Sequence, residues 1–263
     1  MELNYRYFGG EGKEPLVIIH GLLGSSRNWI AIGKALAADY EVFALDMRNH
    51  GESPHDNAMD YDVLTGDLMD FLDQRGLDKV HLLGHSMGGK VAMQASIEYF
   101  RRVESLCVVD IAPKNYAPYQ KDDFEAMRAL DLQTLGSRKE ADALLQPAVP
   151  DYAYRMFLLT NLKRAEEGGF AWGVNLEVLY QALDTLRGNN VAAEERYTGP
   201  SLFILGGQSR FVSEADHEMI REHFPRVVIK TLQQSGHNPH LDATEDFIEL
   251  YRDFARVDWG CEI

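Results

Sequence analysis

Cysteine, basic residues and long apolar runs are all in short supply in this chain of 263 residues. Its two cysteines, Cys107 and Cys261, are too few for the disulfide framework of a small secreted domain. Its apolar runs are far shorter than the roughly 20 residues that a membrane-spanning helix needs. The first residues lack the basic-then-apolar pattern of a signal peptide. We therefore expect a reducing, cytoplasmic setting without membrane insertion.

Positive charge is outnumbered, because 26 lysines and arginines face 41 aspartates and glutamates, a formal net charge of −15 at pH 7. A nucleic-acid surface needs clustered cations to contact phosphates, so the composition excludes this class of partner. The acidic excess also disfavours strongly anionic substrates. We expect a small-molecule substrate, and nothing in the sequence indicates an obligate protein partner.

Short apolar runs alternate with amphipathic segments of helical length. Apolar runs of this kind are typical of strands that are buried on both faces of a parallel sheet. The expected strands cover residues 16–20, 41–45, 80–84, 105–111, 201–205 and 227–232, with room for one edge strand at 3–8, and the expected helices cover 61–75, 89–100 and 243–256. The alternation predicts an α/β fold with a mostly parallel central sheet flanked by helices.

The alternation stops near Asp110. Residues 114–195 contain helical fragments rich in aromatic residues, methionine and leucine, and no convincing strand pattern. We expect a helical cap here, inserted between two parts of an α/β core, residues 1–113 and 196–263. Its aromatic and methionine residues are candidates to line a substrate pocket, although packing explains most of them equally well: Tyr116, Tyr119, Phe124, Met127, Tyr152, Met156, Phe157, Phe170, Trp172 and Tyr180.

The strongest chemical signal is the run Gly84-His85-Ser86-Met87-Gly88, which follows an expected strand and precedes an expected helix. A strand-to-helix turn this sharp leaves space only for glycine on either side of the serine. The turn lifts the hydroxyl clear of the sheet, close to a helix N-terminus that favours negative charge. Ser86 is therefore the candidate nucleophile.

A second loop, His20-Gly21-Leu22, also follows an expected strand. A loop at this place can aim the backbone N–H of Leu22 at the space above the serine. Together with the N–H of Met87 it would form an oxyanion hole. We interpret His20 itself as structural.

The loop Gly236-His237-Asn238-Pro239-His240 lies between the last strand and the last helix. A histidine here can reach the serine as the general base. Both His237 and His240 are possible, and the preceding glycine and its position favour His237.

A histidine base needs an acid to orient it. In sheets of this kind the acid usually follows the next-to-last strand, but Ser209 occupies that place. Asp110 ends the strand after the serine turn and is the preferred candidate. Glu214 and Asp216 are alternatives, although the pattern of a helix start after Ser213 also explains them.

A further polar loop begins at Asp46. This residue could be another acid or a metal ligand, but a hydrogen-bonded loop that shapes the pocket floor is the simpler interpretation. No cysteine–histidine pattern supports zinc, no Asp-rich loop supports calcium, and no phosphate-binding glycine loop is present. We expect neither a metal nor a cofactor.

Taken together, the His-Gly loop, the loop at 46–53, the serine turn and the Gly-His loop resemble the α/β-hydrolase superfamily. Asp110-Ile111-Ala112-Pro113 and the absence of an acid at 209 make the chain more similar to small bacterial serine esterases of the YbfF type. The resemblance implies a helical cap and a carboxylesterase that also accepts thioesters.

These features predict hydrolysis of short- to medium-chain carboxylic esters through Ser86, His237 and Asp110. An acyl-CoA thioesterase and a C–C bond hydrolase would use the same triad, and a ligand sensor could use the same fold. The net charge of −15 slightly disfavours both of these rival enzymes, because their substrates are anionic.

Overall fold

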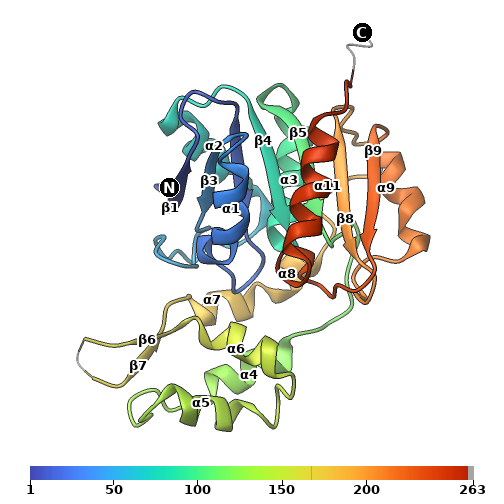
Figure 1. The fold of residues 1–263 in the computed structure, drawn as a ribbon. Coiled ribbons are helices and arrows are strands. Elements are labelled where there is room, and N and C mark those ends of the chain that lie inside the picture. Colours follow the sequence, from blue (N-terminus) through green and yellow to red (C-terminus); the bar gives the residue numbers. More distant parts are fainter. Residues whose placement is uncertain (167, 260–263) are drawn as a thin grey trace.

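A central sheet of seven strands runs through the computed structural model, which describes residues 1–166 and 168–259 (Figure 1). The strand order is β1-β3-β2-β4-β5-β8-β9, and only β1 runs antiparallel to its neighbour. The strands are β1 (Tyr5–Gly9), β2 (Pro15–Ile19), β3 (Glu41–Leu45), β4 (Val80–His85), β5 (Val103–Val109), β8 (Ser201–Gly206) and β9 (Val227–Leu232). The predicted mostly parallel sheet is confirmed.

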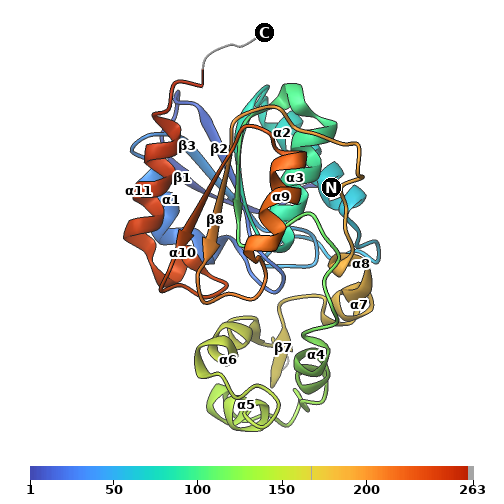
Figure 2. The same ribbon diagram turned by 90° about the vertical axis from the view of Figure 1, so that its right-hand side faces the viewer.

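Helices cover both faces of this sheet (Figure 2). One face packs against α1 (Ile30–Leu36) and α11 (Thr244–Ala255), and the other packs against α2 (Tyr61–Arg75), α3 (Met87–Glu98) and α9 (His217–His223). Because side chains alternate along a strand, each buried strand supplies both cores. In β2, for example, Leu16 belongs to the α1–α11 core and Val17 to the other. The short α10 (Pro239–Asp242) precedes α11.

Local signals fix α2 at the predicted residues 61–75. The Asp60 side chain accepts a hydrogen bond from the Val63 N–H, which caps the first turn. Gly76 ends the helix in a left-handed conformation with φ 64°. Other boundaries differ by a residue or two from the predictions. The strand β5 ends at Val109, and Asp110 is therefore the first residue of the loop that follows it.

The segment between β5 and β8 lies across the carboxyl ends of the strands (Figure 1). Five of its elements are helices: α4 (Lys121–Arg128), α5 (Arg138–Leu145), α6 (Tyr152–Leu159), α7 (Leu176–Gln181) and α8 (Leu183–Arg187). It also contains an antiparallel pair, β6 (Leu162–Arg164) and β7 (Phe170–Trp172), which the sequence analysis did not predict. Each of these strands is only three residues long, too short for an alternating pattern to be recognised. We call residues 114–195 the inserted segment.

No helix in the described part of the chain has the length and apolar character needed to cross a membrane. Cys107 is a free thiol buried in β5. Cys261 lies outside the described residues. The cytoplasmic setting stays a prediction.

Candidate active site

The turn between β4 and α3 holds Ser86 in an unusual backbone conformation, with φ 52° and ψ −118°. A Cβ atom on Gly84 would lie 2.2 Å from the carbonyl oxygen of Gly88. One on Gly88 would lie 2.4 Å from the carbonyl oxygen of Ile19. Both glycines are therefore required by close approach of the backbone, as the sequence predicted. Strain of this kind is concentrated at functional sites, and here it holds the serine at the carboxyl end of β4.

Ser86, His237 and Asp110 form a continuous hydrogen-bonded chain. The Nε2 atom of His237 lies 3.1 Å from the Ser86 Oγ, and its Nδ1 atom lies 2.7 Å from the Asp110 Oδ2. The three residues come from loops after β4, β5 and β9, so they are brought together only by the sheet. In this arrangement the Nδ1–H donates to the carboxylate, and Nε2 is available to accept the serine proton.

Asp110 is fully buried, and its backbone φ is 50°. Its Oδ1 accepts a hydrogen bond from the Gly206 N–H at 2.9 Å, and its Oδ2 accepts a short one from the Ser209 hydroxyl as well as the bond from His237. Ser209 therefore stands where the sequence analysis expected an acid, and it supports the acid on the neighbouring strand instead.

The alternative acids lie elsewhere. Asp216 accepts hydrogen bonds from the Lys114 ammonium at 2.6 Å and from the Ser213 N–H at 2.8 Å. It is the last residue of a short helix, Glu214–Asp216, that Ser213 caps. This matches the interpretation of Glu214 and Asp216 as a helix start.

Aromatic rings enclose the His237 imidazole on two sides. The Phe211 ring stacks on it with a centroid separation of 3.6 Å and an interplanar angle of 13°. The His85 ring lies 4.8 Å away on centroids, and its Nε2–H donates to the His237 carbonyl at 2.8 Å. Burial lowers the pKa of His85 well below its ordinary value, so this ring is neutral near pH 7. The stacking restricts rotation of the His237 ring.

His240, the rival base, is in a different environment. It is buried, and its ring stacks on Trp29 at 4.2 Å and 8°. Burial lowers the pKa of His240 to about 3. Its Nδ1 atom has no hydrogen-bond partner among the described residues. It makes no contact that would serve a reaction at Ser86.

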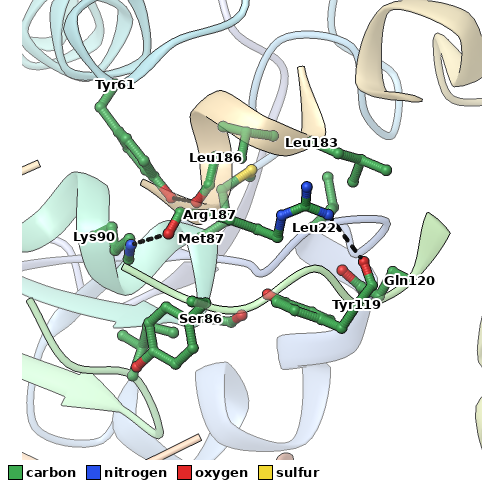
Figure 3. A pocket seen from close by; sticks show the side chains of 12 residues that line it. Leu22, Tyr61, Ser86, Met87, Lys90, Tyr119, Gln120, Leu183, Leu186 and Arg187 are labelled. Carbon is green, nitrogen blue, oxygen red and sulfur yellow. Dashed lines mark hydrogen bonds between the residues drawn. The ribbon is translucent and has the colours of Figure 1, made fainter. Parts of the chain in front are cut away.

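The two expected oxyanion donors, the N–H groups of Leu22 and Met87, belong to residues near the serine. Met87 is the first residue of α3, and N–H groups in the first turn of a helix have no acceptor within the helix. The Leu22 N–H finds no acceptor among residues 1–166 and 168–259. Both residues line one cavity with Ser86 (Figure 3). The oxyanion hole formed by these two N–H groups stays a prediction.

This cavity is narrow. Residues of the core and of the inserted segment line it together: Leu22, Tyr61, Ser86, Met87, Lys90, Ile111, Tyr116, Tyr119, Gln120, Leu183, Leu186 and Arg187. Of the ten aromatic and methionine candidates in the inserted segment, only Tyr116 and Tyr119 line it. Phe124, Met127 and Phe170 are buried in the packing, and Tyr152 is exposed.

Lys90 is a buried cation on this cavity wall whose role the sequence analysis did not recognise. Its ammonium donates to the carbonyl oxygens of Lys114 at 3.0 Å, Arg187 at 3.4 Å and Gly188 at 2.5 Å. Lys114 begins the inserted segment and Gly188 lies near its end, so one side chain joins both connections between the segment and the core. Figure 3 shows the bond from Lys90 to Arg187. Burial lowers the pKa of Lys90 to about 8.

The loop after β3 is held by hydrogen bonds to other loops. Asp46 accepts hydrogen bonds from the N–H groups of Ser26 and Glu52 and from the Asn4 amide. This matches its interpretation as a residue that shapes a loop. His20 accepts from the Met47 N–H at 3.0 Å and contacts the Gly21 carbonyl at 2.7 Å. Burial lowers the pKa of His20, so the ring is neutral and donates to that carbonyl.

A parallel sheet with a nucleophile turn after β4 and a histidine loop after β9 defines the class of α/β hydrolases. The family described as alpha/beta hydrolase fold matches residues 14–244, and the chain belongs to this family. The match covers most of both parts of the core and all of the inserted segment.

Several known proteins are similar along nearly the whole chain. The sn-1-specific diacylglycerol lipase ABHD11 of Mus musculus is 38% identical, with 97% of this chain and 85% of that protein covered. Esterase YbfF of Escherichia coli (strain K12) is 31% identical, with 96% and 98% covered. A solved structure described as a marine microorganism esterase is 34% identical with a TM-score of 0.93, covering 96% of this chain and 99% of that one. These relatives support a serine hydrolase that acts on esters.

Proposed function

We propose that the protein hydrolyses carboxylic esters of short to medium acyl length, with Ser86 as nucleophile, His237 as general base and acid, and Asp110 as the orienting acid. The observation that carries the proposal is the chain of two hydrogen bonds from Ser86 through His237 to the buried carboxylate. Esterase and lipase relatives along the whole chain support the same reaction class.

In the first half of the reaction, His237 Nε2 takes the proton of Ser86 as Oγ attacks the acyl carbon. The carbonyl oxygen becomes an oxyanion that accepts hydrogen bonds from the N–H groups of Leu22 and Met87. The intermediate collapses when the ester C–O bond breaks. His237 gives its proton to the leaving alkoxide, which departs as an alcohol and leaves an acyl group on Ser86.

Water completes the cycle. His237 Nε2 takes a proton from water as its oxygen attacks the acyl carbon, and the second oxyanion forms at the same two donors. His237 then returns the proton to the Ser86 oxygen, and the carboxylic acid leaves. Asp110 keeps the Nδ1 proton on the imidazole throughout and stabilises the imidazolium that forms twice in each turnover.

The inserted segment acts in this proposal as a cap. Tyr119 and Leu183 of the segment line the cavity together with residues of the core (Figure 3). The cavity leaves little free space around Ser86. It therefore favours small esters, and the two leucines of α8 suit an apolar acyl chain. The proposed partner is a small-molecule ester alone.

Hydrolysis of acylglycerols is a second candidate. A relative that is 38% identical over 97% of this chain is named an sn-1-specific diacylglycerol lipase. A long acyl chain needs more space than the cavity offers, so this candidate requires the cap to move. The two candidates differ in their acyl-length profile.

The test is hydrolysis of p-nitrophenyl esters from acetate to palmitate by the wild-type protein and by Ser86→Ala. We expect fast turnover of the short esters, a steep fall toward palmitate, and loss of about 10⁶ in kcat for Ser86→Ala. A maximum at the long chains would favour the acylglycerol lipase.

No turnover of any ester by folded wild-type protein would contradict the proposal. If Ser86 still reacted with a fluorophosphonate, the serine would be activated for a different substrate. Acyl-CoA thioesters and β-diketone acids would then be tested for thioester and C–C hydrolysis. A protein inactive on all three would be examined as a ligand sensor.

A further inference from the structure

Hydrogen bonds fix the peptide group that carries the Leu22 N–H. The Gly21 carbonyl accepts from the Gly24 N–H at 2.9 Å and from the His20 ring at 2.7 Å. This carbonyl and the Leu22 N–H belong to one planar peptide and point in opposite directions. Fixing the carbonyl therefore fixes the direction of the proposed oxyanion donor.

The next residue, Leu23, has a positive φ of 62° and a fully buried side chain. A non-glycine residue keeps this conformation only where its surroundings impose it. Its N–H donates to His50 Nε2 at 3.1 Å. Its carbonyl accepts from the side-chain amide of Asn161 at 2.8 Å. These two bonds hold the strained residue directly beside the oxyanion donor.

Asn161 belongs to the inserted segment, between α6 and β6, and its bond to Leu23 spans 138 positions of the chain. It is 7% exposed, and its own carbonyl accepts from the Gly173 N–H at 2.7 Å. The residue that carries the amide is therefore itself held within the segment. Its buried bond therefore joins the inserted segment to a strained residue of the core.

The second bond of Leu23 also leads to the inserted segment. His50 follows Asn49, whose carbonyl accepts from the Asn175 N–H at 3.0 Å and whose side-chain oxygen accepts from the Asn175 amide at 3.1 Å. Burial lowers the pKa of His50 to about 3, which keeps its ring neutral and its Nε2 an acceptor. Both hydrogen bonds of Leu23 thus depend on the position of the segment relative to the core.

We propose that Asn161 is a positioning residue for the oxyanion hole, through which the inserted segment holds the Leu22 N–H in place. The inference rests on the proposed ester hydrolysis and goes beyond it, because it gives the segment a part in the chemical step in addition to shaping the cavity. Asn161 acts through Leu23 and touches no reacting atom.

The test compares Asn161→Ala and Asn161→Asp with matched variants at Asn190. The Asn190 amide also donates at 2.8 Å to a core carbonyl, that of Lys90, but at the other junction of the segment. Three quantities are measured for each folded variant. They are kcat and KM for p-nitrophenyl acetate, affinity for a trifluoromethyl ketone that adds to the serine, and the rate at which a fluorophosphonate labels Ser86.

Loss of a complete oxyanion donor lowers kcat by about 10² to 10³, and a displaced donor should lose part of this. We expect Asn161→Ala and Asn161→Asp to lower kcat about tenfold or more with KM within about twofold. The ketone affinity and the labelling rate should fall by the same factor. Both Asn190 variants should keep all three quantities within about twofold of wild type, even where the melting temperature falls.

Two results would overturn the inference. One is wild-type kcat in folded Asn161→Ala and Asn161→Asp. The other is a fall in kcat while ketone affinity and labelling rate stay at wild-type values, because the oxyanion hole would then be intact. If the wild type hydrolyses no ester, the proposed function fails, and the labelling rates of the variants still decide the role of Asn161.

Discussion

The loops after three strands of the core contain residues with positive φ, whereas the inserted segment reaches the same site through side chains. The strands β2, β4 and β5 are neighbours in the sheet, and the loops after them contain Leu23, Ser86 and Asp110 at φ 62°, 52° and 50°. The segment contributes ring faces, an amide and cavity walls. We infer that the backbone of the core places the reacting groups, and that side chains of the segment make only smaller corrections to their positions. Substitution of Ser86, His237 or Asp110 should lower kcat far more than any substitution in the segment.

The largest effect should follow from the acid in the core. Asp110→Asn keeps the shape but gives His237 a partner that no longer favours its Nδ1–H tautomer. We expect kcat for a p-nitrophenyl ester to fall by about 10⁴ with a wild-type melting temperature. Ser209→Asp added to Asp110→Asn should recover more than tenfold, because the Ser209 hydroxyl already contacts the Asp110 carboxylate. If Asp110→Asn kept a tenth of the wild-type kcat, Asp110 would not be the orienting acid.

Acid pH should destabilise the protein through the buried histidines of the core. All nine histidines lie outside residues 114–195. Burial lowers the pKa of both His50 and His240 to about 3 in the folded protein, below the ordinary value of 6.5. The unfolded chain therefore binds more protons below pH 6.5. Their contribution to stability is complete above that pH and is lost as the pH falls toward 3.

Between pH 6.5 and 4.5 each of these two histidines should reduce the free energy of unfolding by about 2 kcal/mol. His240→Phe preserves the stack on Trp29 and should remove one of the two losses. Denaturant unfolding at pH 6.5 and pH 4.5 measures the loss of stability in the wild type and in His240→Phe. An equal loss of stability in the variant and the wild type would show that His240 does not titrate in this way.

A smaller effect is expected from the support of the acid. In Ser209→Ala the Asp110 carboxylate keeps its bonds from Gly206 and His237 and loses one hydroxyl donor. One hydrogen bond of this kind corresponds to about tenfold or less in rate. We expect kcat to fall by less than about tenfold. A greater loss in Ser209→Ala than in Asp110→Asn would reverse the assignment of the acid.

The smallest effect should come from an exposed contact of the segment. Lys163 donates to Glu52 at 2.7 Å, and the two side chains are 38% and 55% exposed. Solvent-exposed ion pairs contribute at most about 1 kcal/mol. Lys163→Met should lower the free energy of unfolding by less than that and leave kcat unchanged. A tenfold loss of kcat would break the contrast between core and segment.

The same contrast explains what could be predicted from the sequence. The core was predictable because its turns impose residue types, as Gly84 and Gly88 do around Ser86, and because the parallel strands end at one edge. Asp110 could be chosen once Ser209 was found in the usual place of the acid. These cues are local, so a single sequence contains them.

The segment was less predictable because its functional contacts are distant in sequence. No local pattern in the sequence predicts three of its features. They are the bond from Asn161 to Leu23, the pair β6–β7, and the bonds of Lys90 to both ends of the segment. The stack of Phe211 on His237 likewise depends on two loops that meet only in the fold. Lys90 is the one of these residues that stands out in the sequence, because it is a cation in an otherwise apolar helix start. Its partners could not be predicted.

The central claim is that Ser86 carries the reaction, and covalent labelling tests it most directly. The protein is inactivated with a fluorophosphonate, and peptide mass spectrometry locates the label as ester hydrolysis declines. We expect one label per chain, on Ser86, with activity lost in proportion to labelling. Full inactivation with the label on another residue, or full ester turnover by protein labelled at Ser86, would contradict the account.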